Sequence, residues 1–257
     1  MKISIITPSF NQDKYIKSTL ESVLNQKGDF DLQLIVIDGG STDNSLNILN
    51  KYSNKITLIS EKDEGQSDAL NKGLMMAEGE IIGWLNSDDI YYPNALQSVC
   101  TRFAKNKNTE WVYGKCNIIN EKGVEIRKNI TAYKNHRMRK FSYNKLLHEN
   151  FISQPAVFFR KELLLNTGFV DKGLRYTMDY DLWLRLAKIS KPEFIPIYLA
   201  GFRRHNDSKS ENNYKDQFQE QYIVMGKNSN SRYHKIIHKI LNFRTVATYN
   251  CLNIFKK

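Results

Sequence analysis

The sequence predicts an α/β fold with a mostly parallel central sheet flanked by helices. Within the first 85 residues, four apolar strand candidates alternate with segments whose apolar residues recur at helical spacing. This alternation is typical of β-α-β units, which build parallel sheets. The strand candidates are nearly continuous apolar runs, as expected for strands covered by helices on both faces. The predicted core is therefore Rossmann-like, and a helical extension follows it from about residue 211.

The predicted strands of the first half span residues 2–7, 32–38, 56–60 and 80–85. Polar side chains lie at or just beyond their carboxyl ends: Thr7, Asp38, Asp63, Asn86, Ser87, Asp88 and Asp89. Parallel strands end at the same edge of their sheet, and ligands bind beyond that edge. These side chains therefore predict one concave polar face.

The second half is predicted to be less regular. Residues 110–128 favour an antiparallel hairpin with its turn at residues 120–123. Residues 129–150 are basic, and we expect a loop and a short helix there. Residues 180–187 predict a helix and residues 194–199 a strand.

The composition is that of a soluble globular protein. With 41% hydrophobic and 25% charged residues, a chain of 257 residues can bury a sizeable core. No apolar run approaches the ~18 residues of a membrane span, and the N-terminus lacks a signal-peptide pattern. Cys100, Cys116 and Cys251 are widely spaced and show no metal or disulfide pattern. We therefore expect a protein of the reducing cytoplasm.

The net charge of +11 arises from two stretches. Residues 127–145 contain seven Lys or Arg and no acid, and residues 226–257 contain another seven and no acid. The two stretches together hold 14 cations and no acid, which exceeds the net charge of +11, so the remaining residues carry a small net negative charge. Nucleic acid and an anionic membrane both suit such stretches as partners. Residues 129–150 show no RNP, KH or zinc-finger spacing, so a solvated loop is the alternative there.

The adjacent acids Asp88 and Asp89 are candidates for metal chemistry. They follow an apolar strand, and neighbouring carboxylates repel each other and resist desolvation unless a cation or a donor-rich ligand is present. Mg²⁺ and Mn²⁺ take oxygen ligands and keep part of their coordination shell for substrate phosphates. The alternative is a solvated acidic turn in which Asp89 caps the next helix.

Six short motifs follow one another along the chain. They are Thr7-Pro8-Ser9-Phe10-Asn11, Ile37-Asp38-Gly39-Gly40-Ser41-Thr42-Asp43, Asp63-Glu64-Gly65-Gln66, Asn86-Ser87-Asp88-Asp89, Gln154-Pro155-Ala156 and Met178-Asp179-Tyr180-Asp181. In order and spacing this set resembles the family-two glycosyltransferases, over about residues 1–210. The resemblance implies the A-type nucleotide-sugar fold. It also implies a catalytic domain of residues 1–210, with a nucleotide-binding half (1–100) and an acceptor half (101–210), before an extension of residues 211–257.

The resemblance further implies a donor site for a UDP-sugar. Its residues are expected to be Thr7, Pro8, Ser9, Asp38, Asp63, Gly65, Gln66, Asn71, Asn86, Ser87, Asp88 and Arg204. Asp38 would accept a hydrogen bond from the uracil N–H, because an ionised carboxylate only accepts. The alternative for Asp38 is a turn aspartate before Gly39 and Gly40. Lys72 is a weaker candidate, since it suits a helix surface equally well.

A divalent ion, Mn²⁺ or Mg²⁺, is implied as well. The family motif is usually Asp-x-Asp-Asp, whereas this chain has Asn86 in place of the first acid. The ion is therefore expected on Asp88, with Asp89 as a second ligand and His205 completing the shell. Imidazole suits Mn²⁺ better than Mg²⁺. The alternative for His205 is a lone surface histidine.

Asp179 is the expected general base. Family members often have Glu-Asp where this chain has Met178-Asp179. The base would remove the acceptor hydroxyl proton as the oxygen attacks the anomeric carbon. A place at a helix N-terminus would favour the ionised carboxylate. A plain N-cap role is the alternative.

These expectations define an inverting glycosyltransferase that forms a β-glycosidic bond in surface polysaccharide synthesis, such as O-antigen or capsule. The acceptor is expected to be a glycan on a polyprenyl diphosphate, and nucleic acid is not expected as a partner. A sugar nucleotidyltransferase is one alternative, but residues 7–12 lack the glycines of its phosphate loop. A non-catalytic nucleic-acid-binding module is the other, but it would not explain acids at the strand ends.

The C-terminal extension is predicted to be an amphipathic helix. Tyr233, Ile236, Ile237, Ile240 and Leu241 fall at helical spacing, and Arg232, Lys235 and Lys239 form a separate basic row. This pattern is typical of a helix lying on anionic lipid. Packing against the catalytic domain or a second subunit is the alternative. We expect the enzyme on the inner face of the cell membrane.

Overall fold

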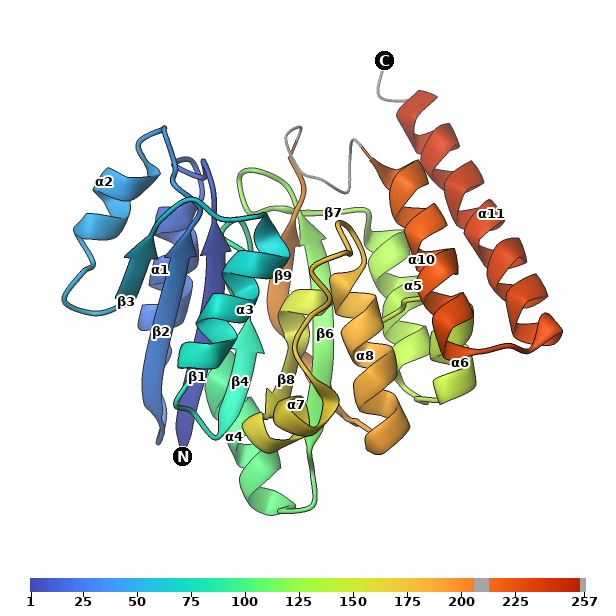
Figure 1. The fold of residues 1–257 in the computed structure, drawn as a ribbon, viewed down its shortest axis with the longest axis horizontal. Coiled ribbons are helices and arrows are strands. Elements are labelled where there is room, and N and C mark those ends of the chain that lie inside the picture. The colour runs from blue at the N-terminus through green and yellow to red at the C-terminus, as the bar shows by residue number, and fades with distance from the viewer. Residues whose placement is uncertain (206–212, 255–257) are drawn as a thin grey trace.

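The computed structural model describes residues 1–205 and 213–254. Its strands are β1 (Lys2–Ser9), β2 (Asp31–Asp38), β3 (Thr57–Ser60), β4 (Ile81–Trp84), β5 (Ile90–Tyr91), β6 (Trp111–Ile119), β7 (Glu125–Ile126), β8 (Val157–Arg160) and β9 (Glu193–Arg203). They form one sheet in the order β3-β2-β1-β4-β8-β6-β9-β5, with β7 paired to β6 (Figure 1). This sheet is the framework of the molecule.

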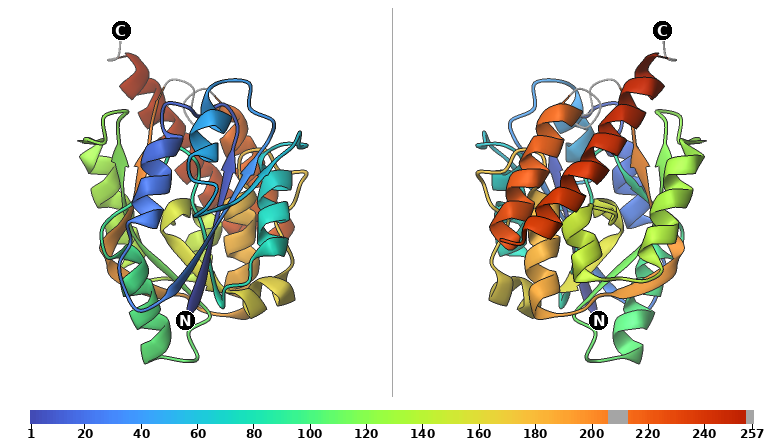
Figure 2. Two further views of the ribbon diagram at one scale, coloured as in Figure 1. Left: turned by 90° about the vertical axis from the view of Figure 1, so that its left-hand side faces the viewer. Right: turned by 90° about the vertical axis from the view of Figure 1, so that its right-hand side faces the viewer.

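Helices cover both faces of the sheet (Figures 1 and 2). They are α1 (Ile16–Leu24), α2 (Ser45–Asn50), α3 (Gln66–Met76), α4 (Ala95–Lys105), α5 (Lys128–Met138), α6 (Tyr143–His148), the 3₁₀ turn η1 (Gln154–Ala156), α7 (Lys161–Thr167), α8 (Met178–Ile189), α10 (Tyr214–Asn228) and α11 (Arg232–Ile254). The predicted α/β fold with a helical C-terminal extension is confirmed.

The first four strands run parallel, as predicted. β1 pairs with β2 on one side and with β4 on the other, so the strand order reverses between β1 and β4. The register aligns Ser9 with Asp38, and Asp38 with Ser60. Their carboxyl ends therefore meet at one edge, and the reversal makes that edge the place where a ligand is expected.

The later strands mix directions. β8 runs antiparallel to β4 and β6, whereas β9 runs parallel to β6. β6 and β7 form the hairpin predicted for residues 110–128. The strand predicted at residues 194–199 is β9, which is longer at both ends.

Two apolar layers hold the helices to the sheet. Ile6 and Ile35 point to the face covered by α3 and α8, while Ile5 and Val36 point to the face covered by α1 and α4. Side chains alternate between the faces of a strand, so neighbouring residues of β1 and β2 serve different layers. This explains why the strands are apolar at nearly every position.

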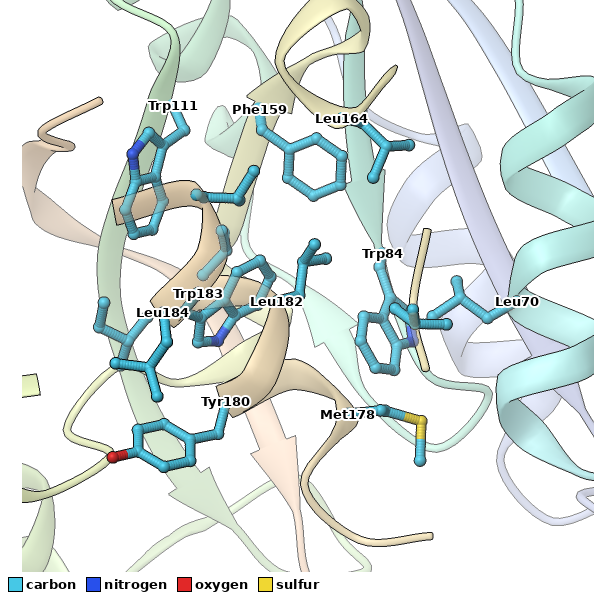
Figure 3. Packing of buried hydrophobic residues seen from close by; sticks show 14 of the residues in the cluster. Leu70, Trp84, Trp111, Phe159, Leu164, Met178, Tyr180, Leu182, Trp183 and Leu184 are labelled. Atoms are coloured by element: carbon cyan, nitrogen blue, oxygen red, sulfur yellow. The ribbon is translucent and has the colours of Figure 1, made fainter. Parts of the chain in front are cut away.

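α8 is fixed by aromatic packing on the sheet. Trp183 of α8 stacks on Trp111 of β6, with ring centroids 6.2 Å apart. Ser67 Oγ, on α3, donates a hydrogen bond to the sulfur of Met178 at 3.0 Å. Figure 3 shows Met178, Trp84 and Leu70 at the edge of this cluster nearest α3. The beginning of α8 is thus held against α3 and the end of β4.

Residues 129–150 are more helical than we expected. They form most of α5 and all of α6, because two long-range contacts order a segment whose own sequence is polar. The hydroxyl of Tyr113 donates to the carbonyl of Met138 at 2.6 Å, and Leu146 and Leu147 are buried. Tertiary packing therefore outweighs local propensity here.

The C-terminal extension consists of two helices, α10 and α11, that lie side by side against α6 and α8 (Figure 2). The predicted boundary at residue 210 lies outside the described residues. Within the described residues, no helix is both long enough and apolar enough to cross a bilayer.

Candidate active site

The loops that follow β1 and β2 are tied to each other. Asn11 adopts φ of 51°, and its Oδ1 accepts a hydrogen bond from the Thr42 N–H at 2.8 Å. Its own N–H donates to Ser41 Oγ, also at 2.8 Å. These bonds fix the rim of the predicted nucleotide pocket. Thr7, Pro8 and Ser9 lie buried at the end of β1 beneath this rim.

Asp38 organises the turn after β2. The residue is fully buried, and its Oδ2 accepts hydrogen bonds from the N–H groups of Gly40 and Ser41 and from the Ser60 hydroxyl. The Ser41 hydroxyl donates to its other oxygen. The turn role raised as an alternative is therefore present. Base recognition by Asp38 stays a prediction.

Asp63 lies directly above Gly39. A Cβ at Gly39 would approach Asp63 Oδ2 to 2.5 Å, so any side chain there would force this carboxylate to move. The other oxygen, Oδ1, accepts the Gly65 N–H at 2.8 Å. Gly65 precedes α3 with φ of 115°, a conformation that side chains disfavour. Asp63 and Gly65 thus set the entry to α3 at the edge of the predicted donor site.

Asn86 joins three elements at the end of β4. Its Oδ1 accepts hydrogen bonds from Trp84 Nε1 at 2.8 Å and from Gln66 Nε2, on α3, at 2.9 Å. Its Nδ2 donates to Gln154 Oε1 at 3.2 Å. Gln154 Nε2 in turn donates to the Trp84 carbonyl at 2.6 Å. An amide is required, because an aspartate could accept the first two bonds but could not donate the third.

Asn71 and Lys72 of α3 already have partners within the protein. The Asn71 amide exchanges two hydrogen bonds with the backbone of Val170, at 3.0 and 3.1 Å. Lys72 Nζ lies 2.7 Å from Glu61 and 3.3 Å from Asp68. The first pair positions the segment before α8, and the second is a surface ion-pair cluster. A donor contact from Asn71 stays a prediction.

Asp88 and His205 form the pair expected at a metal site. His205 Nε2 lies 3.0 Å from Asp88 Oδ2, although the two residues are far apart in sequence. The imidazole is nearly buried, whereas the Asp88 side chain is one-fifth exposed. The ring of Tyr15 packs on the imidazole, with centroids 4.6 Å apart. His205 is therefore buried against Asp88 and is not a lone surface histidine, while metal binding by it stays a prediction.

The oxygen and nitrogen donors of this pair suit Mn²⁺. In the described chain, no group of three or more His, Cys, Asp or Glu could hold a metal ion. An ion on Asp88 and His205 would accordingly keep positions for diphosphate oxygens and water, as hard divalent ions commonly do. The residues present therefore fit a metal that is shared with the substrate.

Asp89 points away from the open side of this pair. It is fully buried, and its Oδ1 accepts the Arg203 N–H at 2.8 Å. Burial, and secondly the neighbouring Asp88 charge, raises the pKa of Asp89 well above its ordinary value. Thr19 Oγ1 donates to the carbonyls of Ser87 and Asp89, at 2.9 and 2.8 Å. Asp89 thus helps to shape the turn, and direct metal contact by it stays a prediction.

Arg203 is a structural clamp that the motifs did not reveal. Its guanidinium donates to the carbonyls of Asp88, Asn120 and Glu121, at 2.7 to 3.1 Å. It thereby joins the turn after β4 to the loop between β6 and β7. Arg204, a predicted donor-site residue, follows it with its side chain buried at the same end of β9.

Asp179 lies in the first turn of α8, as predicted, and is half-buried. Asn150 Nδ2 donates to its Oδ2 at 3.4 Å, a long and weak bond. Burial raises the pKa of Asp179 to about 6, and nearby backbone N–H groups, Lys134 and Asn150 oppose that shift. A carboxylate with such a pKa is suited to accept a proton near neutral pH.

Two further residues lie beside the predicted site. Gln154 was visible only as part of the Gln154-Pro155 motif, and its role depends on contacts with residues about seventy positions away. Phe10 follows β1 with 57% of its surface exposed, beside the predicted nucleotide pocket. An exposed aromatic at that place is the signal for stacking on a base.

Parallel strands whose carboxyl ends meet at one edge, followed by later strands of mixed direction and covered by helices on both faces, define the A-type glycosyltransferase fold. The chain belongs to glycosyl transferase family 2, since the model of "Glycosyl transferase family 2" matches residues 4–167. The predicted family is confirmed, and membership selects glycosyl transfer over the two alternatives.

Relatives support this assignment. An uncharacterized glycosyltransferase of Rickettsia typhi is 29% identical over 85% of this chain and 68% of its own length. Chondroitin synthase of Pasteurella multocida is 29% identical over 96% of this chain, but the match spans only 24% of that enzyme. Hyaluronan synthase of Pasteurella multocida is 28% identical, over 89% of this chain and 23% of that enzyme.

Solved structures show the same fold. S. aureus TarS (1–349) in complex with UDP-GlcNAc superposes with a TM-score of 0.70 at 19% identity, covering 91% of this chain and 69% of that one. The mannosyltransferase PcManGT from Pyrobaculum calidifontis, in complex with GDP-Man and Mn²⁺, gives 0.71 at 16% identity, covering 94% and 69%. At these identities the likeness concerns the fold alone.

Proposed function

We propose that this enzyme transfers a sugar from a UDP-sugar to a glycan hydroxyl with inversion, forming a β-glycosidic bond in surface polysaccharide synthesis. The synthase relatives and the UDP-GlcNAc complex of TarS support the substrate classes. The acceptor is proposed to be a glycan on a polyprenyl diphosphate at the inner face of the cell membrane.

One observation carries the proposal: α3 links the two chemical centres. Its first residue, Gln66, bonds to Asn86 at the end of β4, and the next residue, Ser67, bonds to Met178 beside Asp179. The donor turn and the base are thereby held against one short helical segment. A sugar bound at the first centre would be presented to an acceptor bound at the second.

The proposed step uses Asp179 as general base. The acceptor oxygen bonds to the anomeric carbon as the bond from that carbon to the diphosphate oxygen breaks. The hydroxyl proton passes to Asp179, and the electron pair of the broken bond leaves with UDP. Proton transfer to a positioned carboxylate contributes about 10²- to 10⁴-fold in rate.

Asp88 and His205 would hold the divalent ion. When bound, the ion neutralises the diphosphate charge that grows as UDP departs. Structures of PcManGT and of the Mycobacterium tuberculosis glucosyl-3-phosphoglycerate synthase contain Mn²⁺, which supports this part of the proposal. Phe10 is proposed to stack on the base, and Asp38 or Asp63 to accept its N–H.

The test is a panel of UDP-, GDP- and CMP-sugars with Mn²⁺, Mg²⁺ or EDTA, scored by release of nucleotide. We expect release from a UDP-sugar, stimulated by an oligosaccharide acceptor and lost with EDTA. Preference for another base, or full activity in EDTA, would overturn the donor or the metal assignment. An α-linked product from an α-linked donor, seen by NMR, would overturn inversion.

A further inference from the structure

The outer face of α11 is apolar. Tyr233, Ile236, Ile240 and Phe243 are exposed by 63, 57, 51 and 74%, so more than half of each side chain contacts solvent. The apolar residues that the sequence predicted as one stripe therefore lie on two faces of α11, and Ile237 and Leu241 are not among the exposed ones. These four residues point outward, and we call them the outer row. Single exposed apolar residues are ordinary, but a continuous row on one helix marks an interaction site.

The inner face of α11 is already packed. His238 is fully buried, and its Nδ1 lies 2.7 Å from the Leu147 carbonyl on α6. His234 Nδ1 lies 2.8 Å from Nε2 of His148, the last residue of α6. These contacts anchor α11 to the body of the enzyme. The outer row is thus presented on a fixed helix.

The charges around the outer row are basic. Arg232 and Lys239 directly precede Tyr233 and Ile240, so they run along one side of the row. Residues 226–257 contain no acid. In the described part of the chain, Arg232 and Lys239 take part in no ion pair, although Lys239 Nζ lies over the Tyr222 ring at 4.9 Å. Their charges remain available to an anionic partner.

The fold brings the second basic stretch to the same place. Residues 127–145 form α5 and the beginning of α6, and α11 packs on α6. The Tyr133 hydroxyl on α5 donates a hydrogen bond to Glu149, which follows α6, and His148 of α6 contacts His234 of α11, so the two stretches lie close together. Figure 2 shows α5, α6 and α11 on one side of the molecule. Two stretches separated by 80 residues in the sequence therefore lie close together in the fold.

We propose that the outer row and its flanking cations form a docking surface for an anionic lipid bilayer. Exposed apolar residues between cations on one helix suit the headgroup boundary, where apolar burial and attraction to anionic lipid act together. The carboxyl-terminal end of α11 lies on the side of the molecule to which β1, β4 and β6 point (Figure 1). The outer row occupies the first half of α11, so docking would lay the side of the molecule that carries this helix on the bilayer.

A second copy of the chain is the competing occupant, and the charges disfavour it. The 3-4-3 spacing of the outer row is that of a coiled-coil seam. Arg232, Lys239 and Arg244 would flank such a seam, with no acid on α11 to oppose them. Parallel and antiparallel pairing both set cation against cation, which is destabilising. An anionic lipid surface would attract these cations, so no such repulsion arises there.

The test is co-sedimentation of the full chain with phosphatidylcholine vesicles, with and without phosphatidylglycerol. We expect binding that requires phosphatidylglycerol and is lost at high salt. The double variant Ile236→Ser/Phe243→Ser should weaken binding at least about tenfold, and Arg232→Gln and Lys239→Gln about fivefold each. The matched control is Leu165→Ser, which removes an equally exposed leucine from α7 and should bind as the wild type.

Three results would overturn the inference: no binding by the wild type, unchanged binding by the double variant, or equal loss in Leu165→Ser. A wild-type dimer that the double variant converts to a monomer, without vesicle binding, would assign the surface to a second copy. Far-ultraviolet circular dichroism checks folding. The idea that the membrane carries the acceptor rests on the proposed function. The binding of the protein to vesicles does not depend on that function. The double variant should still transfer sugar to a water-soluble acceptor. This measurement therefore distinguishes a failure of membrane docking from a failure of the proposed glycosyl transfer.

Discussion

The end of β4 and the beginning of α8 both present aspartates to the proposed site, in opposite surroundings. At β4, the Asn86 amide is engaged by Trp84, Gln66 and Gln154, and Asp89 Oδ1 accepts the Arg203 N–H. At α8, Asp179 has one weak side-chain hydrogen bond and a pKa of about 6. The first region is held in shape by its hydrogen bonds, and the second presents a partly exposed carboxylate that few bonds hold.

The comparison implies that the α8 aspartate matters for rate and little for binding. Asp179→Asn should lower kcat by about 10²- to 10⁴-fold, because an amide cannot accept the proton. The affinity for UDP with Mn²⁺, measured by calorimetry, should stay within about threefold of the wild type, since no donor contact is removed. Near-normal turnover would show that another group is the base.

For Asp88, which follows β4, we expect a large effect on the affinity for UDP. Asp88→Asn should weaken Mn²⁺-dependent UDP binding by about 100-fold, because the ion loses its charged protein ligand. Asp31→Asn, at the exposed start of β2, is the matched control and should bind normally. Equal affinity of Asp88→Asn and the wild type would place the metal elsewhere.

Replacing Asn86 by aspartate, the residue usual in the family at this position, should destabilise the protein. In Asn86→Asp, the new carboxylate faces Gln154 Oε1 without a hydrogen to donate, and Gln154 cannot turn without losing the Trp84 carbonyl. We expect a loss of about 1–3 kcal/mol in the free energy of unfolding, measured by urea denaturation. Asn50→Asp on exposed α2 should change it little. An unchanged value would mean that the amide is dispensable.

The smallest expected effect concerns pH. The base must be ionised, and its pKa is raised to about 6, so kcat/KM should fall about tenfold per unit as the pH drops below 6. Asn150 stabilises the ionised form, so Asn150→Ala should move this acid limb upward by about half a unit. A limb that stays near pH 4 would contradict the burial of Asp179.

Patterns that are local in the chain were predictable. The four parallel strands, the hairpin at residues 110–128 and the place of Asp179 in the first turn of a helix follow from periodicity and ordered motifs. The closeness of Asp88 and His205 was also anticipated, because the resemblance to the glycosyltransferase family implied a late histidine beside the acidic motif. Such features depend on a few neighbouring residues.

The shape of the site itself was decided by tertiary contacts. The bonds of Asn86 to Gln66 and Gln154, and the clamp of Arg203 on Asp88, join residues 20 to 115 positions apart. No periodicity encodes such partners, because each depends on how the strands are ordered and which faces the helices cover. The same holds for the two basic stretches. The sequence determined that both exist, and only the packing of α11 on α6 brought them close together.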